Sequence, residues 1–342
     1  MRRRDFIAIV GGALLSCRRA LGDNSVLSKD PLVSQFNLES LQDSYTPLDE
    51  FYVRNHNPLP PDLSKLALRI DGEVERPQTL ASADLARLET RRLAAVLECA
   101  GNGIGPYELA GNAQWEGWPL GDVLRLAGLR PSAAHLHLKG RDGFIRSVPL
   151  ARTAKDALLA TRMNQEPLPP THGAPWRALF PGYYGMDSVK WLEQITVSST
   201  PLQPVSDDYF ALQKRPDGSV QRADLPGIQL KSAFVYPAVG AVLQIGRVDA
   251  RGVVWSNGEK VLGVEVSADG GKTWRLAQID PGGSPYEWKF WRATLELSER
   301  GLAELACKAI GADGHEQPSE RPAGRADDYG DNRIERIRVL VM

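Results

Sequence analysis

A single cysteine, Cys99, stands where an apolar stretch gives way to small residues. The stretch Leu93 to Leu97 is typical of a buried strand, and the run Ala100-Gly101-Asn102-Gly103 after it is typical of a loop. A strand would therefore present a thiol on a loop at the edge of the fold. Such a thiol can be a nucleophile, a ligand of a soft metal or a small buried apolar residue, and this segment alone leaves all three open.

A nucleophilic cysteine needs a base, and no histidine lies near Cys99 in the sequence. His56 and His172 are the candidates to approach it in the folded chain. Two other histidines, His135 and His137, stand two apart on an expected strand, and we assign them to ordinary structure rather than to a metal site.

The elements expected in the first half of the chain are short and of both kinds. Five prolines in residues 23–65 predict an irregular wrapping segment. Alternating apolar residues over 66–70 predict a short strand and a hairpin. Helices are expected over 83–89, with Ser82 as the cap, and over 120–127. The first half is therefore expected to be a mixed α/β domain in an α+β protein.

From about residue 225 the pattern changes to alternating strands separated by turn residues. Leu262, Val264 and Val266 are expected to face one way, before a turn at 269–271. The alternation returns over 303–309, where Cys307 is expected to be an inert core residue, and over 337–341. This texture predicts an all-β sandwich.

These patterns divide the chain into three parts. We expect an export signal over 1–22, a catalytic domain over 23–215 and a β-sandwich over 216–342, with the proline-bearing stretch 201–225 as the linker. The division follows from the change of pattern along the chain.

The beginning of the chain has the composition of an export signal. Three arginines precede the apolar stretch 6–15, which is too short to cross a membrane. Arg3-Arg4-Asp5-Phe6-Ile7 is similar to the twin-arginine type, which carries folded proteins. We expect cleavage after Gly22, in preference to lipid attachment at Cys17, and a periplasmic location.

Composition excludes several classes of protein. In 342 residues, 41 Lys and Arg nearly cancel 42 Asp and Glu, which argues against nucleic acid as the partner. Three cysteines make no disulfide framework, and no apolar run reaches the roughly 20 residues of a transmembrane helix. The expected partner is a small molecule or another protein.

Three ordered motifs resemble the sulfite oxidase family of molybdenum enzymes. They are Phe51 to Pro58, Glu98-Cys99-Ala100-Gly101-Asn102, and the series His172 to Arg177, Pro181 to Gly185 and Ser188 to Leu192. The stretches 264–274 and 307–309 resemble that family's immunoglobulin-like dimerisation domain. The resemblance implies a molybdopterin-binding catalytic domain, followed by an immunoglobulin-like sandwich that forms a homodimer.

The resemblance also implies a molybdenum–molybdopterin cofactor, with Cys99 as the one protein thiolate on the metal. The pterin ends in a phosphate and carries many donors and acceptors, so its pocket needs inward-facing basic and polar groups. Carried over motif by motif, the cofactor contacts besides Cys99 are Asn55, His56, Asp142, His172, Arg177, Ser188, Val189 and Lys190.

The implied reaction is oxygen-atom transfer to a small sulfur oxyanion, most simply sulfite to sulfate. Arg54 is expected to supply charge to the substrate, and Tyr209, in the pair Asp208-Tyr209, to donate a hydrogen bond. The sequence has no Cys-x-x-Cys-His motif for haem. We therefore expect electrons to leave to a separate acceptor such as a c-type cytochrome.

The chain departs from the family pattern at two places. It has Gly103-Ile104 where similar sulfite oxidases carry arginines, and Asp327, with Arg325 close by, where they place another. Each lost charge-assisted hydrogen bond is worth about 1.5–3 kcal/mol. We expect weak, salt-sensitive sulfite binding or another sulfur substrate. The alternatives are a sulfane dehydrogenase-like subunit acting on carrier-bound sulfur and a non-catalytic periplasmic scaffold.

Overall fold

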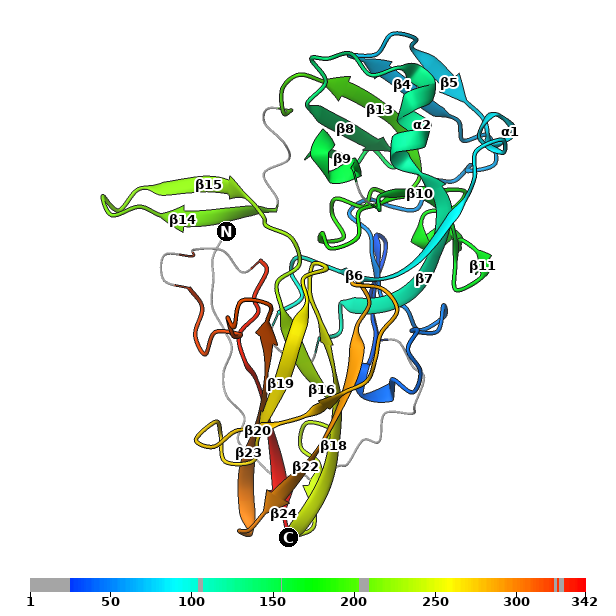
Figure 1. The fold of residues 1–342 in the computed structure, drawn as a ribbon. Helices are drawn as coiled ribbons and strands as arrows, with labels where there is room; N and C mark the ends of the chain where they lie inside the picture. The colour runs from blue at the N-terminus through cyan, green and yellow to red at the C-terminus, as the bar shows by residue number, and fades with distance from the viewer. Residues whose placement is uncertain (1–24, 104–106, 155, 203–208, 323–324, 326–328) are drawn as a thin grey trace, which may run out of the picture.

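The computed structural model describes residues 25–103, 107–154, 156–202, 209–322, 325 and 329–342 (Figure 1). The expected signal with Cys17, and the residues Ile104, Asp208 and Asp327, lie outside this described part. Within it the chain is mostly strand, with two α-helices, α1 (Ser82–Leu85) and α2 (Leu120–Ala127). Neither they nor any other described helix has the length and apolar character needed to cross a bilayer.

Three sheets build the N-terminal region, which lies in the upper part of Figure 1. The first is antiparallel and contains β1 (Ser25–Lys29), β2 (Leu32–Gln35) and β3 (Val53–Arg54). The second contains β6 (Arg91–Glu98), β7 (Ala110–Pro119), β10 (Leu158–Met163), β11 (Glu166–Pro167) and β12 (Arg177–Leu179). The third contains β4 (Leu68–Gly72), β5 (Gln78–Leu80), β8 (His135–Gly140), β9 (Ile145–Pro149) and β13 (Leu192–Ser198). Three 3-10 turns lie between these strands: η1 (Leu38–Ser40), η2 (Leu150–Thr153) and η3 (Pro170–His172).

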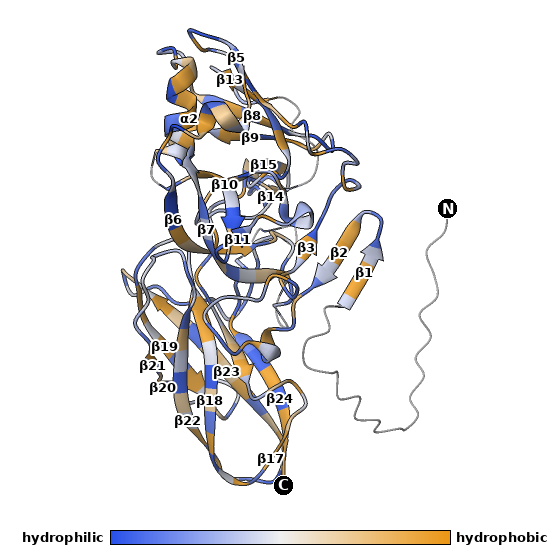
Figure 2. Ribbon diagram, turned by 90° about the vertical axis from the view of Figure 1, so that its right-hand side faces the viewer, coloured by the Kyte–Doolittle hydropathy of each residue, from blue (hydrophilic) through white to orange (hydrophobic). Residues whose placement is uncertain are grey.

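Two sheets face each other as a β-sandwich in the lower part of Figure 1. One contains β16 (Lys231–Tyr236), β18 (Gly246–Trp255), β21 (Gln278–Ile279) and β22 (Lys289–Leu297). The other contains β17 (Val242–Leu243), β19 (Val261–Ser267), β20 (Arg275–Leu276), β23 (Gly301–Gly311) and β24 (Glu335–Val341). Figure 2 shows apolar and polar residues alternating along these strands, because one face of each sheet is buried against the other.

The sandwich shares a core with the N-terminal region. Trp115 of β7 belongs to the same buried cluster as Trp255 of β18 and Trp288, which immediately precedes β22. The indole of Trp288 also donates to the carbonyl of Ser44, at 2.8 Å, across the two parts of the chain. The sandwich is therefore packed against the N-terminal region and helps to hold it in place.

The helix over 120–127 is confirmed with the same bounds. Leu120, Val123, Leu124 and Ala127 are buried on one of its faces, and Gly128 ends it with φ 71°. The final strand and the alternation over 303–309 are confirmed as well, and Cys307 is fully buried.

The helix expected over 83–89 is wrong in length. Only Ser82–Leu85 is helical, and Ala81 rather than Ser82 is the cap, with its N–H donating to the Asp84 carboxylate at 2.8 Å. Leu85 is the one buried residue of this helix. A single apolar anchor cannot offset the cost of starting a longer helix.

Three other expectations about local structure are wrong. The segment 23–65 is not irregular throughout, because β1, β2 and β3 pair within it. The expected linker 201–225 contains an antiparallel hairpin, β14 (Phe210–Lys214) and β15 (Val220–Asp224), which projects away from the sheets in Figure 1. Leu262 does not face the core with Val264. A bulge between Val261 and Gly263 shifts the register and leaves Leu262 about half exposed.

Candidate active site

Cys99 follows the last residue of β6, at the start of the expected loop. Its N–H donates to the carbonyl of Leu109, and its own carbonyl accepts from the N–H of Asn102, both at 2.9 Å. The Asn102 side chain closes the same turn by accepting from the N–H of Leu109 at 3.0 Å. Cys99 is half-buried and is not in a disulfide. The thiol is therefore held on an ordered turn.

All eleven residues expected in the site line one pocket. Its walls include Arg54, Asn55, His56, Cys99, Asp142, His172, Arg177, Ser188, Val189, Lys190 and Tyr209. They come from β3 and the segment after it, from the end of β6, from the turn between β8 and β9, from the segment η3–β12–β13, and from the base of the hairpin β14–β15. The fold therefore brings together segments that are far apart in the sequence.

The pocket also has walls that the motifs did not single out. They are Tyr52, Leu97, Ala100, Phe144, Gly185, Met186 and Trp191. Phe144 packs on the His56 ring, with centroids 5.4 Å apart. Tyr52 and Trp191 belong to the sequence motifs that resemble the family, so those motifs could have indicated them. Met186 lies outside the motifs, and nothing in the sequence indicates it.

Arg177 is a buried cation that contacts neutral oxygens. Its side chain donates to the carbonyls of His172 at 3.1 Å and Ser188 at 2.6 Å. Burial lowers the pKa of Arg177 to about 10. No carboxylate pairs with it within the described part of the chain, so its positive charge remains available to an anion.

Lys190 is a second such cation. Its Nζ donates to Asn55 Oδ1 at 2.5 Å and to the Thr171 carbonyl at 2.8 Å. Burial, and then the positive charge of Arg177, lower the pKa of Lys190 well below its ordinary value. Arg177 is buried and Lys190 is half-buried, and no carboxylate of the described residues forms an ion pair with either, so together they favour a negatively charged ligand.

His172 and Asp142 are held by their surroundings in unusual states. Burial, with the charges of Lys190 and Arg177, lowers the pKa of His172 to about 3, so its ring is neutral near pH 7. Burial raises the pKa of Asp142, although the Phe144 N–H donates to its carboxylate at 3.1 Å. A neutral imidazole and a carboxyl group can both meet the donors and acceptors of a heterocycle.

Cys99, Arg54 and Tyr209, the three residues expected to take part in the reaction, all line the pocket. Burial raises the pKa of the Cys99 thiol, while the Gly101 N–H and the Arg54 charge oppose that rise. Arg54 is exposed, and Tyr209 is buried with φ 77°, a left-handed backbone that tyrosine rarely adopts. Their positions suit an entering small anion and a nearby hydrogen-bond donor.

The donor set of the pocket fits a molybdenum–pterin group. The described residues contain no cluster of three His, Cys, Asp or Glu that could hold a metal, so a metal at Cys99 needs its other ligands from a cofactor. Among the described residues, the buried Asn55 Nδ2 has no hydrogen-bond partner, and no carboxylate pairs with Arg177 or Lys190. A pterin with a phosphate supplies acceptors for the amide and negative charge for the cations.

Two positions near the pocket carry the departures from the family pattern. Gly103 is exposed, and a Cβ built on it would meet no atom within 4 Å. Arg325 donates to the Tyr329 carbonyl at 2.8 Å, and it is not among the residues that line the pocket. Gly103 and Arg325 therefore add no positive charge to the wall of the pocket.

Comparisons with known proteins agree with this site. A family model for the oxidoreductase molybdopterin binding domain matches residues 56–205, and one for the Mo-co oxidoreductase dimerisation domain matches residues 224–323. The chain is 32% identical over 333 residues to sulfite oxidase of Gallus gallus, which covers 86% of this chain and 72% of that protein. It is 30% identical to mitochondrial sulfite oxidase of Drosophila melanogaster, covering 81% of this chain and 56% of that protein.

A solved structure has the same fold over nearly the whole chain. The sulfane dehydrogenase SoxCD of Paracoccus pantotrophus superimposes with a TM-score of 0.82 at 24% identity, covering 98% of this chain and 96% of that one. The matched molybdopterin-binding domain, residues 56–205, contains most of the residues that line the pocket. The cofactor is thus molybdenum–molybdopterin, and the chain belongs to the sulfite oxidase family of molybdopterin-dependent oxidoreductases.

Proposed function

We propose that this enzyme oxidises sulfite to sulfate and passes the electrons to a separate acceptor. The observation that carries the proposal is that one pocket is lined by Cys99 together with three cations: Arg54, which is exposed, Arg177, which is buried, and Lys190, which is half-buried. Relatives that cover most of this chain are named sulfite oxidases. Sulfite and water give sulfate, two protons and two electrons, so an electron acceptor is required.

The chain's own residues would bind and orient the two guests. Cys99 would be the protein's ligand to the metal, which requires loss of its thiol proton. Arg177, Lys190, His172, Asn55 and their neighbours would hold the pterin and its phosphate. When bound, the cofactor supplies oxygen-atom transfer and two-electron redox chemistry.

The substrate would be held at the open end of the pocket. Arg54 would attract and orient the sulfite anion, and the Tyr209 hydroxyl would donate a hydrogen bond to one of its oxygens. The aromatic walls Tyr52 and Phe144 restrict water around the reacting atoms. The negative charge of sulfite would thus be paired with one exposed cation, Arg54. This agrees with the expectation that sulfite binding is weak and sensitive to salt.

Metal analysis and substrate reduction test this function. The purified, cofactor-loaded protein should contain about one molybdenum per chain, as the single cysteine ligand requires. Anaerobic addition of sulfite should then bleach the molybdenum absorption. Absence of metal from protein matured with ample cofactor would instead support the non-catalytic scaffold.

A second candidate substrate is carrier-bound sulfur, as for a sulfane dehydrogenase-like subunit. The favouring observation is the exposed position of Gly103 beside the cysteine turn, where a Cβ would meet no atom of the described residues within 4 Å. The similarity to the sulfane dehydrogenase structure supports the fold of this candidate. Rapid reduction by a thiol-bound sulfane, with no response to sulfite, would select it.

We also propose a homodimer formed through the sandwich. Val242, Leu340 and Leu302 are paired across β17, β24 and β23, and each is exposed, Leu302 by 82%. A row of exposed apolar residues on one sheet is a typical interaction surface. The dimerisation-domain model matches residues 224–323 and supports this assembly.

Export, domain limits and the electron acceptor remain parts of the proposal. The arginine-bearing segment 1–22 supports twin-arginine export to the periplasm, and cell fractionation with a cleavable tag would test it. We propose domains over 23–215 and 216–342, whose boundary lies in the turn of the hairpin β14–β15. A c-type cytochrome is the proposed acceptor, tested by its reduction in the presence of enzyme and sulfite.

A further inference from the structure

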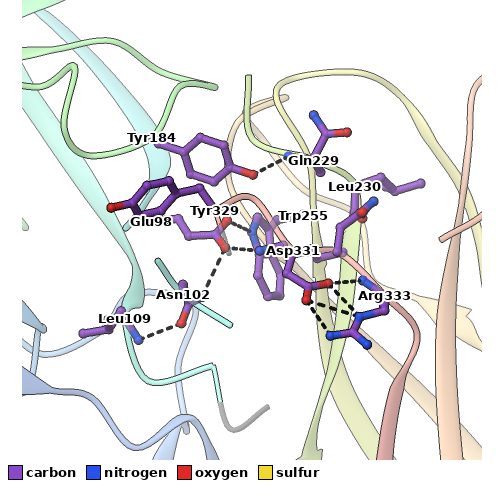
Figure 3. Close-up of polar contacts among 12 residues, drawn as sticks. Glu98, Asn102, Leu109, Tyr184, Gln229, Leu230, Trp255, Tyr329, Asp331 and Arg333 are labelled. Carbon is purple, nitrogen blue, oxygen red and sulfur yellow. Dashed lines mark hydrogen bonds and ion pairs between the residues drawn. The ribbon is translucent and has the colours of Figure 1, made fainter. Parts of the chain in front are cut away.

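A fully buried carboxylate directly precedes the cysteine of the site. Glu98 ends β6, and its side chain is 0% exposed. Its Oε1 accepts from Lys231 Nζ and from Asn102 Nδ2, the latter at 3.1 Å, and its Oε2 accepts from Trp255 Nε1 at 2.9 Å. Figure 3 shows the Glu98 carboxylate directed at Asn102 and Trp255. The cofactor and substrate contacts proposed above do not include this carboxylate.

Two of the three donors belong to the β-sandwich. Lys231 begins β16 and Trp255 ends β18, and the two residues are paired opposite each other in antiparallel register. Because one pair of strands holds both donors, they reach the carboxylate as a unit. The sandwich thus contacts the polypeptide one residue before Cys99.

The direction of the Glu98 side chain is linked to that of the Cys99 side chain. Leu97 and Cys99 both line the pocket, whereas the Glu98 side chain between them is turned toward the sandwich, as expected where successive side chains of an extended chain alternate in direction. The Glu98 carbonyl also accepts from the N–H of Gly185, which lines the pocket, at 2.7 Å. On the other side, the N–H of Gly330 donates to the Ala100 carbonyl at 2.8 Å.

The charges of this contact favour a role in positioning. Lys231 is 0% exposed, its Nζ lies 5.5 Å from the centre of the Tyr107 ring, and Glu98 is its ion-pair partner. A buried ion pair adds little stability over a well-packed apolar pair, yet losing one partner is strongly unfavourable. Such a pair therefore selects one arrangement of the two segments that carry it.

We propose that Glu98 is a positioning residue through which the β-sandwich, by way of Lys231 and Trp255, holds the Cys99 thiolate in the geometry that the metal requires. This inference rests on the proposed function, in which Cys99 binds molybdenum. It makes the sandwich part of the construction of the metal site, in addition to its proposed role in assembly.

The test compares Glu98→Gln and Trp255→Phe with the cofactor-loaded wild type. Both variants should contain molybdenum but show a shifted thiolate-to-molybdenum absorption band. Their kcat should fall by about 10–100-fold, as for other partners that orient metal ligands, with KM for sulfite nearly unchanged. If Glu98→Gln does not accumulate, Trp255→Phe decides alone, because it removes one N–H and keeps an apolar ring.

Glu335→Gln is the matched control. Glu335 is a buried carboxyl group of the same sandwich that accepts from the Phe234 N–H at 2.6 Å, and no hydrogen bond or ion pair among the described residues joins it to the cysteine turn. Its variant should keep the wild-type band and kcat, whatever its stability. A wild-type band and kcat in Trp255→Phe, or an equal change in Glu335→Gln, would overturn the positioning role.

Failure of the proposed function is seen separately. If Cys99→Ser keeps the metal and the wild-type absorption band, then Cys99 is not the ligand and the proposed function itself is wrong. If the band depends on Cys99 and is insensitive to both Glu98→Gln and Trp255→Phe, only the positioning role is lost.

Discussion

Lys190 Nζ and Asn55 Oδ1 lie 2.5 Å apart and join two segments separated by 135 positions in the sequence. The Nδ2 of the same amide is buried in the wall of the pocket and has no hydrogen-bond partner in the part of the chain that the structure describes. The amide is thus oriented by the lysine and presents its N–H₂ group to whatever occupies the site. The side chains of the pocket are therefore arranged to bind a group that carries both negative charge and hydrogen-bond acceptors.

Replacing Lys190 should weaken cofactor retention. Lys190→Met removes one charge-assisted hydrogen bond to the pterin group, which corresponds to about 10–100-fold weaker binding. The measurement is molybdenum and pterin content after dialysis. Lys139→Met is the control, because Lys139 pairs with Glu193 outside the pocket, at 3.0 Å. Equal cofactor loss in both variants would remove Lys190 from the set of contacts.

Replacing Cys99 should abolish the metal–thiolate signature. Cys99→Ser keeps nearly the same volume, and we expect a kcat loss beyond the roughly 100-fold seen when an outer partner of a metal ligand is removed. The absorption spectrum and the kcat are measured together. Cys307→Ser is the control, since Cys307 is buried in the sandwich and should leave the spectrum unchanged.

Sulfite binding should depend on salt through Arg54. Because Arg54 is exposed, added salt screens its attraction for the anion and should raise KM for sulfite. In Arg54→Gln, KM should be high and nearly independent of salt. Tight wild-type binding that is insensitive to salt would contradict the expected weakness of this anion site.

Restoring a cation at Gly103 should improve sulfite binding. The position is exposed and open, so Gly103→Arg adds a guanidinium without a clash at Cβ. One added charge-assisted contact predicts a KM lower by about tenfold or more. Gly103→Gln, which adds a neutral side chain, is the control and should leave KM close to that of the wild type.

The stability of the sandwich should depend on pH through Glu335. Burial raises the pKa of Glu335 to about 8, and Glu39 adds to that rise. Cys307, at 3.8 Å, and Tyr107 are the other titratable groups beside it. The folded chain keeps a proton that the unfolded chain has lost, so the contribution of Glu335 is complete below about pH 4.5 and is lost as the pH rises through 8.

Glu335→Gln should therefore become more stable relative to the wild type between pH 4.5 and 8, by a few kcal/mol in total. The glutamine keeps an acceptor for the Phe234 N–H. Urea unfolding at a series of pH values measures the difference. The exposed Glu299→Gln serves as the control, and a difference that is flat with pH for Glu335→Gln would contradict the prediction.

A charge at the exposed apolar row should dissociate the proposed dimer. Leu302→Glu places a carboxylate on a site that is 82% exposed in the isolated chain, so the fold should tolerate it. Sedimentation should show a monomer where the wild type shows a dimer. A wild type that is monomeric at micromolar concentration would refute the assembly.

Local features of this fold could be predicted from the sequence because their cause lies within each segment. The strand that ends beside Cys99, the helix α2 and the strands of the sandwich follow from periodicity and turn residues that lie within each segment. The motif order identified the cofactor class and the residues expected in its site. The periodicity, the turn residues and each single motif are contained within a few neighbouring residues.

Features that depend on distant partners are seen only in the folded chain. The hairpin β14–β15 forms within the expected linker, and nothing in the sequence around Lys231 indicates that this lysine is fully buried. Its burial requires Glu98, which lies 133 positions away, and the pKa of His172 depends on Lys190 and Arg177 in the same way. Charge, burial and direction are properties of the assembled surroundings of a group, and only the folded chain brings those surroundings together.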